Sequence, residues 1–146
     1  MKLLSPVQFS YIAGIIDGEG YIGLTRYRKN YHFPWSYCAQ CHVVNTNKDL
    51  LIWLYDSTRV GSIVPHSESK KPQHKPAYKW RLQTKEIIPF LEGVKPYLVI
   101  KGRQAEILII YIRETRHDGR VLSDVEIERK LDLYHEITAL NERGLY

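Results

Sequence analysis

Hydrophobic and polar residues follow two different periods along this chain, one typical of helices and the other typical of strands. The N-terminal segment is rich in apolar and small residues. It is preceded by Ser5 and Pro6, and Gln8 stands three positions after the serine. Ser-x-x-Gln is a capping box, and proline is favoured at the first position of a helix. We therefore expect a helix that runs to about Asp17 and is ended by the two glycines that follow.

After this helix, apolar and polar positions alternate, as they do in strands that are buried on one face. Two predicted strands cover 21–31 and 36–44, with a turn at 32–35 between them, and a second pair covers 62–66 and 77–83. Four further helices are expected: one capped by Thr46, one from Thr84 to Leu91, one over 101–114, and one from the capping box of Ser123 and Glu126 to about Asn141. Four antiparallel strands with helices packed on one face make an α+β fold. The length of 146 residues fits a single domain, 1–146.

Composition and charge narrow the class of partner. The hydrophobic content of 44% is that of a folded protein, and the formal net charge of +5 favours a polyanionic partner. No apolar run approaches the ~18 residues of a membrane span. The N-terminal segment is too short for a signal peptide. We therefore expect an intracellular protein that is not secreted and makes no membrane contact.

Cys38-x-x-Cys41-His42 has the form of the attachment sequence for c-type haem. It lies inside a predicted strand, which places the two cysteines on opposite faces of the sheet. Met1 is the only methionine, so a methionine axial ligand is lacking. We expect neither haem nor zinc nor a disulfide here, and two reduced cysteines agree with an intracellular protein.

The end of the first helix combines small residues with a carboxylate. Gly14 and Gly18, beside Ala13, have the spacing G-x-x-x-G, which lets a second backbone approach closely. Glu19 follows at the negative end of the helix dipole, where a carboxylate is disfavoured. If two such helices pair about a symmetry axis, two Glu19 carboxylates at ~4 Å repel each other by about 4 kcal/mol at an effective dielectric constant of ~20. A divalent cation shared by the two carboxylates would replace this repulsion with attraction, so we expect a metal site where the two helices meet.

The faces of the predicted strands differ in chemistry. The inward set is Ile22, Leu24, Tyr37, Ala39, Cys41, Val43, Trp80 and Leu82. The outward set is Gly23, Thr25, Tyr27, Lys29, Ser36, Cys38, Gln40, His42, Lys79, Arg81 and Gln83. Side chains of the outward kind reach phosphates and base edges in a DNA major groove. Further predicted DNA contacts, near strand ends and in the long loop, are Arg26, Arg28, His66, Lys70, Lys71 and Lys75. A solvated sheet face is the alternative that this pattern leaves open.

Residues Ile12 to Gly20 closely resemble the signature of the LAGLIDADG homing endonucleases, with Glu19 as the second acidic residue. The resemblance implies that Glu19 and the backbone carbonyl of Gly18 bind catalytic Mg²⁺, in a site that Mn²⁺ or Ca²⁺ can also occupy. It implies a homing-endonuclease-like core of the ααββαββ type, whose saddle-shaped sheet lies in the major groove of double-stranded DNA. One motif per chain implies a homodimer. The dimer interface would then contain Ile12, Ala13, Gly14, Ile15 and Gly18.

The same resemblance gives roles to residues outside the motif. Lys101 occupies the place of a lysine that enters the active site, where a cation stabilises charge on the phosphate. Asn45 lies where the family often has a polar residue that positions water, although a turn asparagine is an equal alternative. Arg103 is expected to contact the DNA backbone. Asp17, the first acidic residue, is expected to bond backbone amides around its own turn.

Together these features predict a metal-dependent endonuclease that makes a double-strand break at a long, nearly palindromic DNA site. By resemblance it would serve the mobility of an intron or intein, in a prokaryotic cytoplasm or an organelle matrix (chloroplast or mitochondrion). Two other functions remain open: an RNA maturase that binds intron RNA, and a DNA-binding protein that has lost cleavage. The presence of both Glu19 and Lys101 argues against the loss of catalysis.

Overall fold

The computed structural model describes residues 1–28, 35–67, 75–115 and 122–142. Lys29, Lys70 and Lys71, three of the predicted DNA contacts, lie outside these ranges. Across the described residues, no helix is both long enough and apolar enough to cross a membrane.

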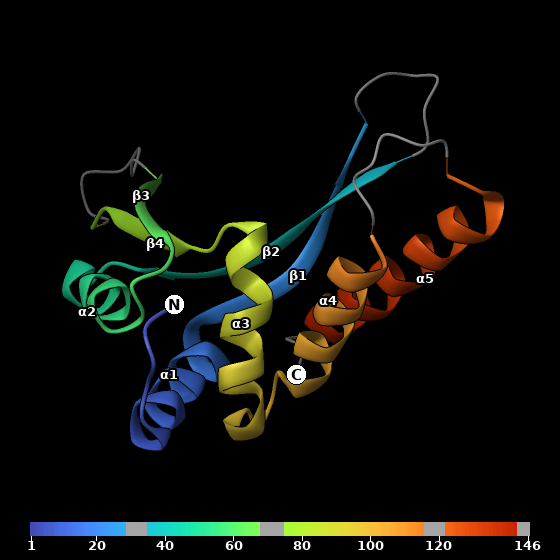
Figure 1. Cartoon of the computed structure of the whole chain (residues 1–146). Coiled ribbons are helices and arrows are strands. Elements are labelled where there is room, and N and C mark those ends of the chain that lie inside the picture. Colours follow the sequence, from blue (N-terminus) through green and yellow to red (C-terminus); the bar gives the residue numbers. More distant parts are fainter. Residues whose placement is uncertain (29–34, 68–74, 116–121, 143–146) are drawn as a thin grey trace.

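Two antiparallel pairs of strands combine into one sheet. Its strands are β1 (Gly20–Tyr27), β2 (Ser36–Asn45), β3 (Ser62–Ser67) and β4 (Ala77–Arg81). Their order across the sheet is β1-β2-β4-β3, and each strand runs antiparallel to its neighbours. The long strands β1 and β2 extend well beyond the shorter pair (Figure 1).

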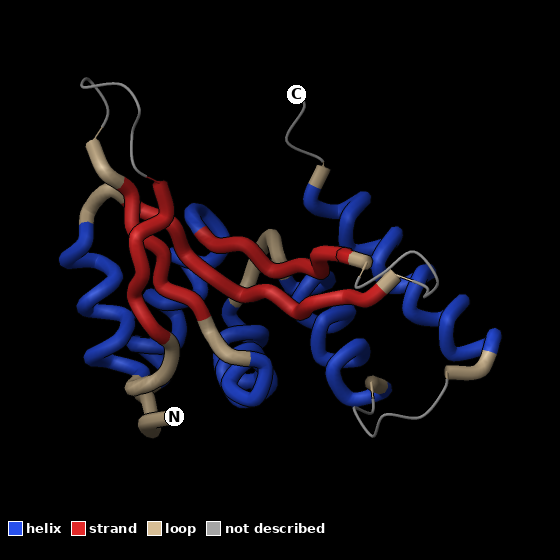
Figure 2. Tube along the Cα trace, turned by 90° about the horizontal axis from the view of Figure 1, so that it is seen from above, coloured by secondary structure: helices blue, strands red, loops and turns tan. Residues whose placement is uncertain are grey.

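The helices all lie on one side of this sheet. They are α1 (Pro6–Glu19), α2 (Lys48–Thr58), α3 (Thr84–Val94), α4 (Gly102–Glu114) and α5 (Asp124–Asn141), with a short 3-10 helix, η1 (Lys95–Tyr97), after α3. Viewed from above, the strands lie in front of the helices and their other face is uncovered (Figure 2). The predicted α+β fold with an antiparallel sheet and helices on one face is therefore confirmed. The element order differs in one respect from the expected ααββαββ type, because a single helix precedes β1.

Alternation along the strands separates core from open face as predicted. Ile22, Val43 and Trp80 are fully buried, with Phe90 of α3 edge-on to the Trp80 ring. The indole nitrogen of Trp80 donates a hydrogen bond to the Val60 carbonyl oxygen at 3.0 Å, so its one polar group is satisfied. The remaining inward residues are buried as well, except Tyr37, which is partly buried.

Helix caps follow the sequence where the capping signal is unambiguous. Both predicted capping boxes form, at Ser5 of α1 and at Ser123 of α5. The cap of α2 is Asn47 and not Thr46. Strand β2 continues to Asn45, whose side-chain oxygen accepts a hydrogen bond from the Asn47 N–H. This bond stabilises a turn after the strand, so α2 begins one residue later than expected.

Helix α3 also begins one residue from the predicted cap. Its N-cap is Gln83 and not Thr84, because the Glu86 carboxylate accepts the Gln83 N–H at 2.8 Å. The helix continues past Leu91 to Val94. Helix α1 likewise continues to Glu19, two residues beyond the predicted end.

The edge strand β1 is held at its open side by the last helix. The Asn141 side-chain nitrogen, at the end of α5, donates a hydrogen bond to the Ile22 carbonyl oxygen at 3.0 Å. A free strand edge presents unpaired backbone groups to other chains. The bond satisfies one such group and attaches the C-terminal end of α5 to the sheet close to the end of α1.

Candidate active site

The C-terminal end of α1 meets the N-terminal end of α4. The Asp17 carboxylate accepts three backbone N–H groups, from Val99 at 2.8 Å, Ile100 at 3.1 Å and Lys101 at 3.0 Å. These amides lie directly before α4, whose N-cap is Lys101, and the helix dipole favours an anion at this end. Asp17 therefore serves as the N-terminal anion of a helix that lies more than 80 residues away in sequence.

Lys101 makes the reciprocal contact. Its ammonium group donates to the backbone carbonyl oxygens of Ile16, at 2.9 Å, and of Gly20. Ile16 belongs to the last turn of α1 and Gly20 is its C-cap, so the ammonium lies at the negative end of the helix dipole, where a cation is favoured. Each helix is thus capped by a charged side chain from the other. We call this pair of contacts the crossed caps.

Burial shapes the chemistry of this lysine. Partial desolvation lowers the pKa of Lys101 from its ordinary value, while the nearby Asp17 and Glu19 carboxylates oppose the shift. A lysine ammonium has three N–H donors, and the two carbonyls take two of them. The third donor is available to a phosphate oxygen or to water.

Glu19 is the last residue of α1 and is exposed. Among the described residues no hydrogen bond or ion pair engages its carboxylate, and Gly18 beside it is also exposed. Within the described residues no group of three or more His, Cys, Asp or Glu side chains lies close enough together to hold an ion. The donor set fits Mg²⁺, which usually takes one or two carboxylates and completes its shell with water and substrate phosphates.

Asn45 lies at the same end of the sheet. Gly20 pairs with Val43, so Asn45 stands two residues past the point where β1 begins. Its side-chain oxygen accepts the Asn47 N–H at 2.7 Å, which is the turn geometry that the sequence left as an alternative. The expected role of Asp17 is corrected in one respect: it bonds backbone amides, but those of the loop before α4 and not those of its own turn.

The uncovered face of the sheet carries most of the predicted DNA contacts. Exposed residues on it or at its edges are Thr25, Tyr27, His66, Lys75, Arg81 and Gln83, and partly exposed ones are Ser36, Cys38, Gln40, His42 and Lys79. Gly23 also belongs to this face, but it is covered by the Tyr21 ring, whose hydroxyl oxygen lies 2.4 Å from where a Cβ would stand. Nothing larger than glycine fits at this position unless Tyr21 moves.

Two predicted contacts lie on the other face. Arg26 and Arg28 stand an even number of positions after Ile22 and Leu24, so their side chains lie on the same face of the sheet. Ile22 and Leu24 are buried under the helices. The Arg26 guanidinium lies over the ring of Tyr134 in α5, at 5.1 Å. Both arginines also lie over the Trp35 ring, at 4.5 Å and 4.4 Å. Strand alternation therefore turns both arginines toward the helix side of the sheet, and their expected contact with the DNA backbone near the strand end stays a prediction.

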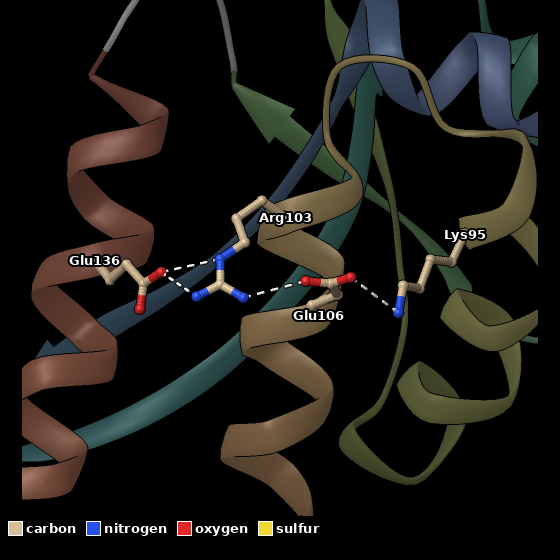
Figure 3. A network of polar contacts seen from close by, with 4 residues as sticks. All are labelled: Lys95, Arg103, Glu106 and Glu136. Atoms are coloured by element: carbon tan, nitrogen blue, oxygen red, sulfur yellow. Dashed lines mark hydrogen bonds and ion pairs between the residues drawn. The ribbon is translucent and has the colours of Figure 1, made fainter.

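Arg103 is engaged within the protein as well. Its guanidinium bonds Glu136 of α5 and Glu106 of α4, and Glu106 is also paired with Lys95 at 3.3 Å (Figure 3). This network links η1, α4 and α5 on the surface. The Glu136 and Glu106 carboxylates therefore already pair with the Arg103 guanidinium, which was expected to contact a DNA phosphate.

His42 and Tyr21 form a unit that the sequence did not reveal. They face each other across β1 and β2 with ring centroids 5.0 Å apart. Burial, with smaller effects from Lys79 and His66, lowers the pKa of His42 to about 4. The Nδ1 atom of His42 is buried without a hydrogen-bond partner. A neutral imidazole with an unpaired nitrogen is suited to a base edge and not to a phosphate.

The exposed side of α1 differs from the predicted interface. Ile12 and Ala13 have no exposed surface, because they pack into the core of their own subunit, so their assignment to the interface was wrong. Gly14 and Gly18 are exposed, and a Cβ added to either would meet nothing within 4 Å. Ile15 is partly buried. The outer side of the helix is completed by Val7 and Tyr11, both exposed.

Comparison with known proteins identifies the fold. No family model and no curated protein match the sequence. The homing endonuclease I-CvuI in complex with DNA matches with a TM-score of 0.75 at 18% identity, over 96% of this chain and 85% of that one. An archaeal intron-encoded homing endonuclease, I-Vdi141I, complexed with DNA matches with a TM-score of 0.76 at 19% identity, over 94% and 86%.

A longer homing endonuclease also matches this chain in structure. The LAGLIDADG homing endonuclease I-SmaMI, bound to cleaved DNA, matches with a TM-score of 0.68 at 19% identity, over 99% of this chain but 46% of that one. The chain therefore has the fold of the LAGLIDADG homing endonucleases. The resemblance of Ile12 to Gly20 to the family signature is confirmed at the level of the fold, with the motif on α1.

The shifted pKa of His42 predicts an acid-sensitive stability. The unfolded chain takes up a proton near pH 6.5 and the folded chain only near pH 4, so the free energy of unfolding falls as the pH drops through that window. After allowance for its partial exposure, the loss is about 1–2 kcal/mol. Urea unfolding at pH 7 and pH 4 should show this loss in the parent protein and not in His42→Gln. His135→Gln, which removes an exposed imidazole from α5, is the control, and equal losses in all three proteins would contradict the assignment.

Proposed function

We propose that this chain is a homodimeric, divalent-metal-dependent endonuclease that makes double-strand breaks at a long, nearly palindromic DNA site. The observation that carries the proposal is the meeting of an exposed Glu19 with the half-buried Lys101 ammonium at the end of a glycine-faced helix. A carboxylate without a protein partner beside a positioned cation is the arrangement that phosphodiester hydrolysis uses.

Glu19 and the Gly18 carbonyl are the residues that would hold Mg²⁺, with Mn²⁺ or Ca²⁺ as substitutes. The ion, when bound, lowers the pKa of coordinated water and screens the charge of the phosphate. Lys101 directs its remaining N–H donor at a phosphate oxygen and stabilises the charge that develops as water adds to phosphorus. The attacking water gives up a proton to solvent, the bond from phosphorus to the departing oxygen breaks, and that oxygen takes up a proton from solvent. Asn45 has its side-chain oxygen in a turn, so its amide nitrogen is the group left to orient water.

The open face of the sheet would bind the DNA. It offers side chains from β1, β2 and β4 that contain both charged groups and hydrogen-bonding groups, and the net charge of +5 supports an anionic partner. The structural neighbours I-CvuI and I-Vdi141I are complexes with DNA. In this proposal Lys79 and Arg81 supply affinity, while Gln40 and His42 read base edges.

A second copy of the chain would supply the second site. One chain holds one Glu19 and one Lys101, whereas a break in both strands needs two phosphodiester bonds cut. The exposed Gly14 and Gly18 allow the α1 helices of two copies to approach each other, and a two-fold axis between them would match a palindromic site. That the chain spans 46% of I-SmaMI supports the pairing of two such units.

The role of Glu19 can be tested by its neutral isostere. Glu19→Gln should lower the rate of cleavage by about a thousandfold or more, because it removes the carboxylate that would hold the ion. Binding to the duplex should remain within a few-fold of the parent. The substrate is a duplex selected from a randomised library by the parent protein. Glu128→Gln, an exposed change on α5, is the matched control, and undiminished cleavage by Glu19→Gln would refute the metal role.

The pairing of α1 helices can be tested at Gly14. A Cβ there meets nothing within 4 Å in its own subunit and Gly14 is exposed, so with leucine at this position the subunit should keep its stability. At a tight helix contact the same side chain overpacks the interface by about 1–3 kcal/mol per copy, which weakens the dimer roughly tenfold or more.

Sedimentation equilibrium measures the association, and urea unfolding measures the subunit. Ala139→Leu, on the exposed surface of α5, serves as the control for added apolar surface. A Gly14→Leu protein that dimerises as tightly as its parent would contradict a contact through this side of α1.

A further inference from the structure

Two rings lie together on the open face of the sheet, at the end of the sheet that adjoins the candidate active site. Tyr21 stands two residues after Glu19 and pairs directly with His42 across β1 and β2. The ring centroids are 5.0 Å apart, and the ring planes are tilted by 37°. Both side chains are half-buried, so the pair keeps some surface toward the place where DNA would pass the active site.

The Tyr21 ring lies along β1 and does not stand away from the sheet. Its hydroxyl group covers the place that a Cβ at Gly23 would take, and Gly23 is buried beneath it. Burial raises the pKa of the Tyr21 hydroxyl, with the Asn141 side chain opposing the shift, so the hydroxyl keeps its proton. Asn141 also holds the edge of β1 through the Ile22 carbonyl oxygen. The ring is thus a fixed and uncharged wall beside His42.

The two nitrogens of the His42 ring have different surroundings. Nδ1 is buried, and within the described residues it has no hydrogen-bond partner. The side chain as a whole is half-buried, and Nε2 is not closed off in this way. Nε2 is therefore the ring nitrogen that can meet a base edge.

The surroundings also decide which nitrogen carries the proton. Burial, with smaller effects from Lys79 and His66, holds the pKa of His42 at about 4, and Arg81 pairs with His42 from β4, so the ring is neutral at pH 7. A neutral imidazole has one N–H. Proteins tolerate a buried acceptor without a donor better than a buried N–H without an acceptor. The favoured tautomer therefore has a lone pair on Nδ1 and the proton on Nε2.

We propose that His42, held in place by Tyr21, donates an Nε2–H hydrogen bond to a base edge near the cut and selects against cytosine there. In the major groove guanine presents the acceptors N7 and O6, adenine presents N7 and thymine presents O4, whereas cytosine presents only its amino donor. This role rests on the proposed function, because it needs DNA on the open face. Tyr21 acts through His42 and is a positioning residue.

The tautomer can be measured without DNA. Nitrogen-15 chemical shifts of the His42 ring in the full chain at pH 7 should show a proton on Nε2 and none on Nδ1. In Tyr21→Ser both tautomers should be populated, because water then reaches Nδ1. Tyr21→Phe keeps the ring and should match the parent. A parent protein with its proton on Nδ1 would overturn the proposal.

The base preference can be measured on a duplex that the parent protein selects from a randomised library. At one base pair of each half-site, near the cut, cytosine in place of the selected base should weaken binding about fivefold, the effect of one hydrogen bond. His42→Phe keeps a ring and lacks the N–H, so it should lose this preference and keep the others. His135→Phe, on the exposed surface of α5, is the matched control. A His42→Phe protein with every preference of its parent would overturn the contact.

The pH dependence of that preference tests the role of Tyr21. In the parent it should be equal at pH 5.5 and pH 8, because the pKa of His42 lies below both. In Tyr21→Ser it should weaken at pH 8, where the neutral ring divides between two tautomers. It should recover at pH 5.5, where a ring that titrates near its ordinary pKa of ~6.5 has a proton on both nitrogens. The parent's preference at both pH values in Tyr21→Ser would contradict a positioning role.

The outcomes separate this contact from the proposed function. A parent protein that binds no duplex overturns the base contact and the proposed function together. Selective binding that ignores His42→Phe overturns the base contact and leaves the endonuclease intact. The expected preference, in a protein that cuts no duplex, supports the His42 contact and counts against the proposed catalysis.

Discussion

The crossed caps between α1 and α4 are the interaction on which the rest of this structure depends. Asp17 supplies an anion to the N-terminal end of α4, and Lys101 supplies a cation to the C-terminal end of α1. Each charge lies at the helix end where the dipole favours it, and each is bonded to backbone groups at that end. The exchange fixes where α1 stops, and so fixes where Glu19 and Lys101 stand relative to each other.

Helix α1 has three roles, and each occupies a different part of its surface. Ile12, Ala13 and Ile16 pack in the core, while Gly14 and Gly18 lie on the outer side. The final turn carries the acidic groups of the candidate site. Because these parts belong to one rigid helix, a partner that docks on the glycine side meets the candidate site at a fixed distance. In the proposed dimer, this geometry would relate the assembly of two copies to the chemistry of each.

Sequence reasoning predicted what depends on neighbours along the chain. The capping boxes at Ser5 and Ser123 form, and strand alternation separated core residues from open-face residues. Contacts between distant segments could not be predicted in this way. Nothing local pairs Arg103 with Glu136, 33 residues later, or joins Asp17 to the start of α4. The interface assignment of Ile12 and Ala13 failed because the packing of the core, not the motif, decides which side of α1 is buried.

The central claim is that two crossed caps, one from each copy, bring two Glu19 carboxylates together over DNA phosphates. The most direct test is anomalous diffraction from crystals of the protein with manganese and a duplex recovered by selection. The account predicts manganese peaks bound by Glu19 from both copies, next to phosphates that Lys101 contacts. Glu19 side chains far apart in solvent, with no manganese beside them in a DNA-bound crystal, would contradict it.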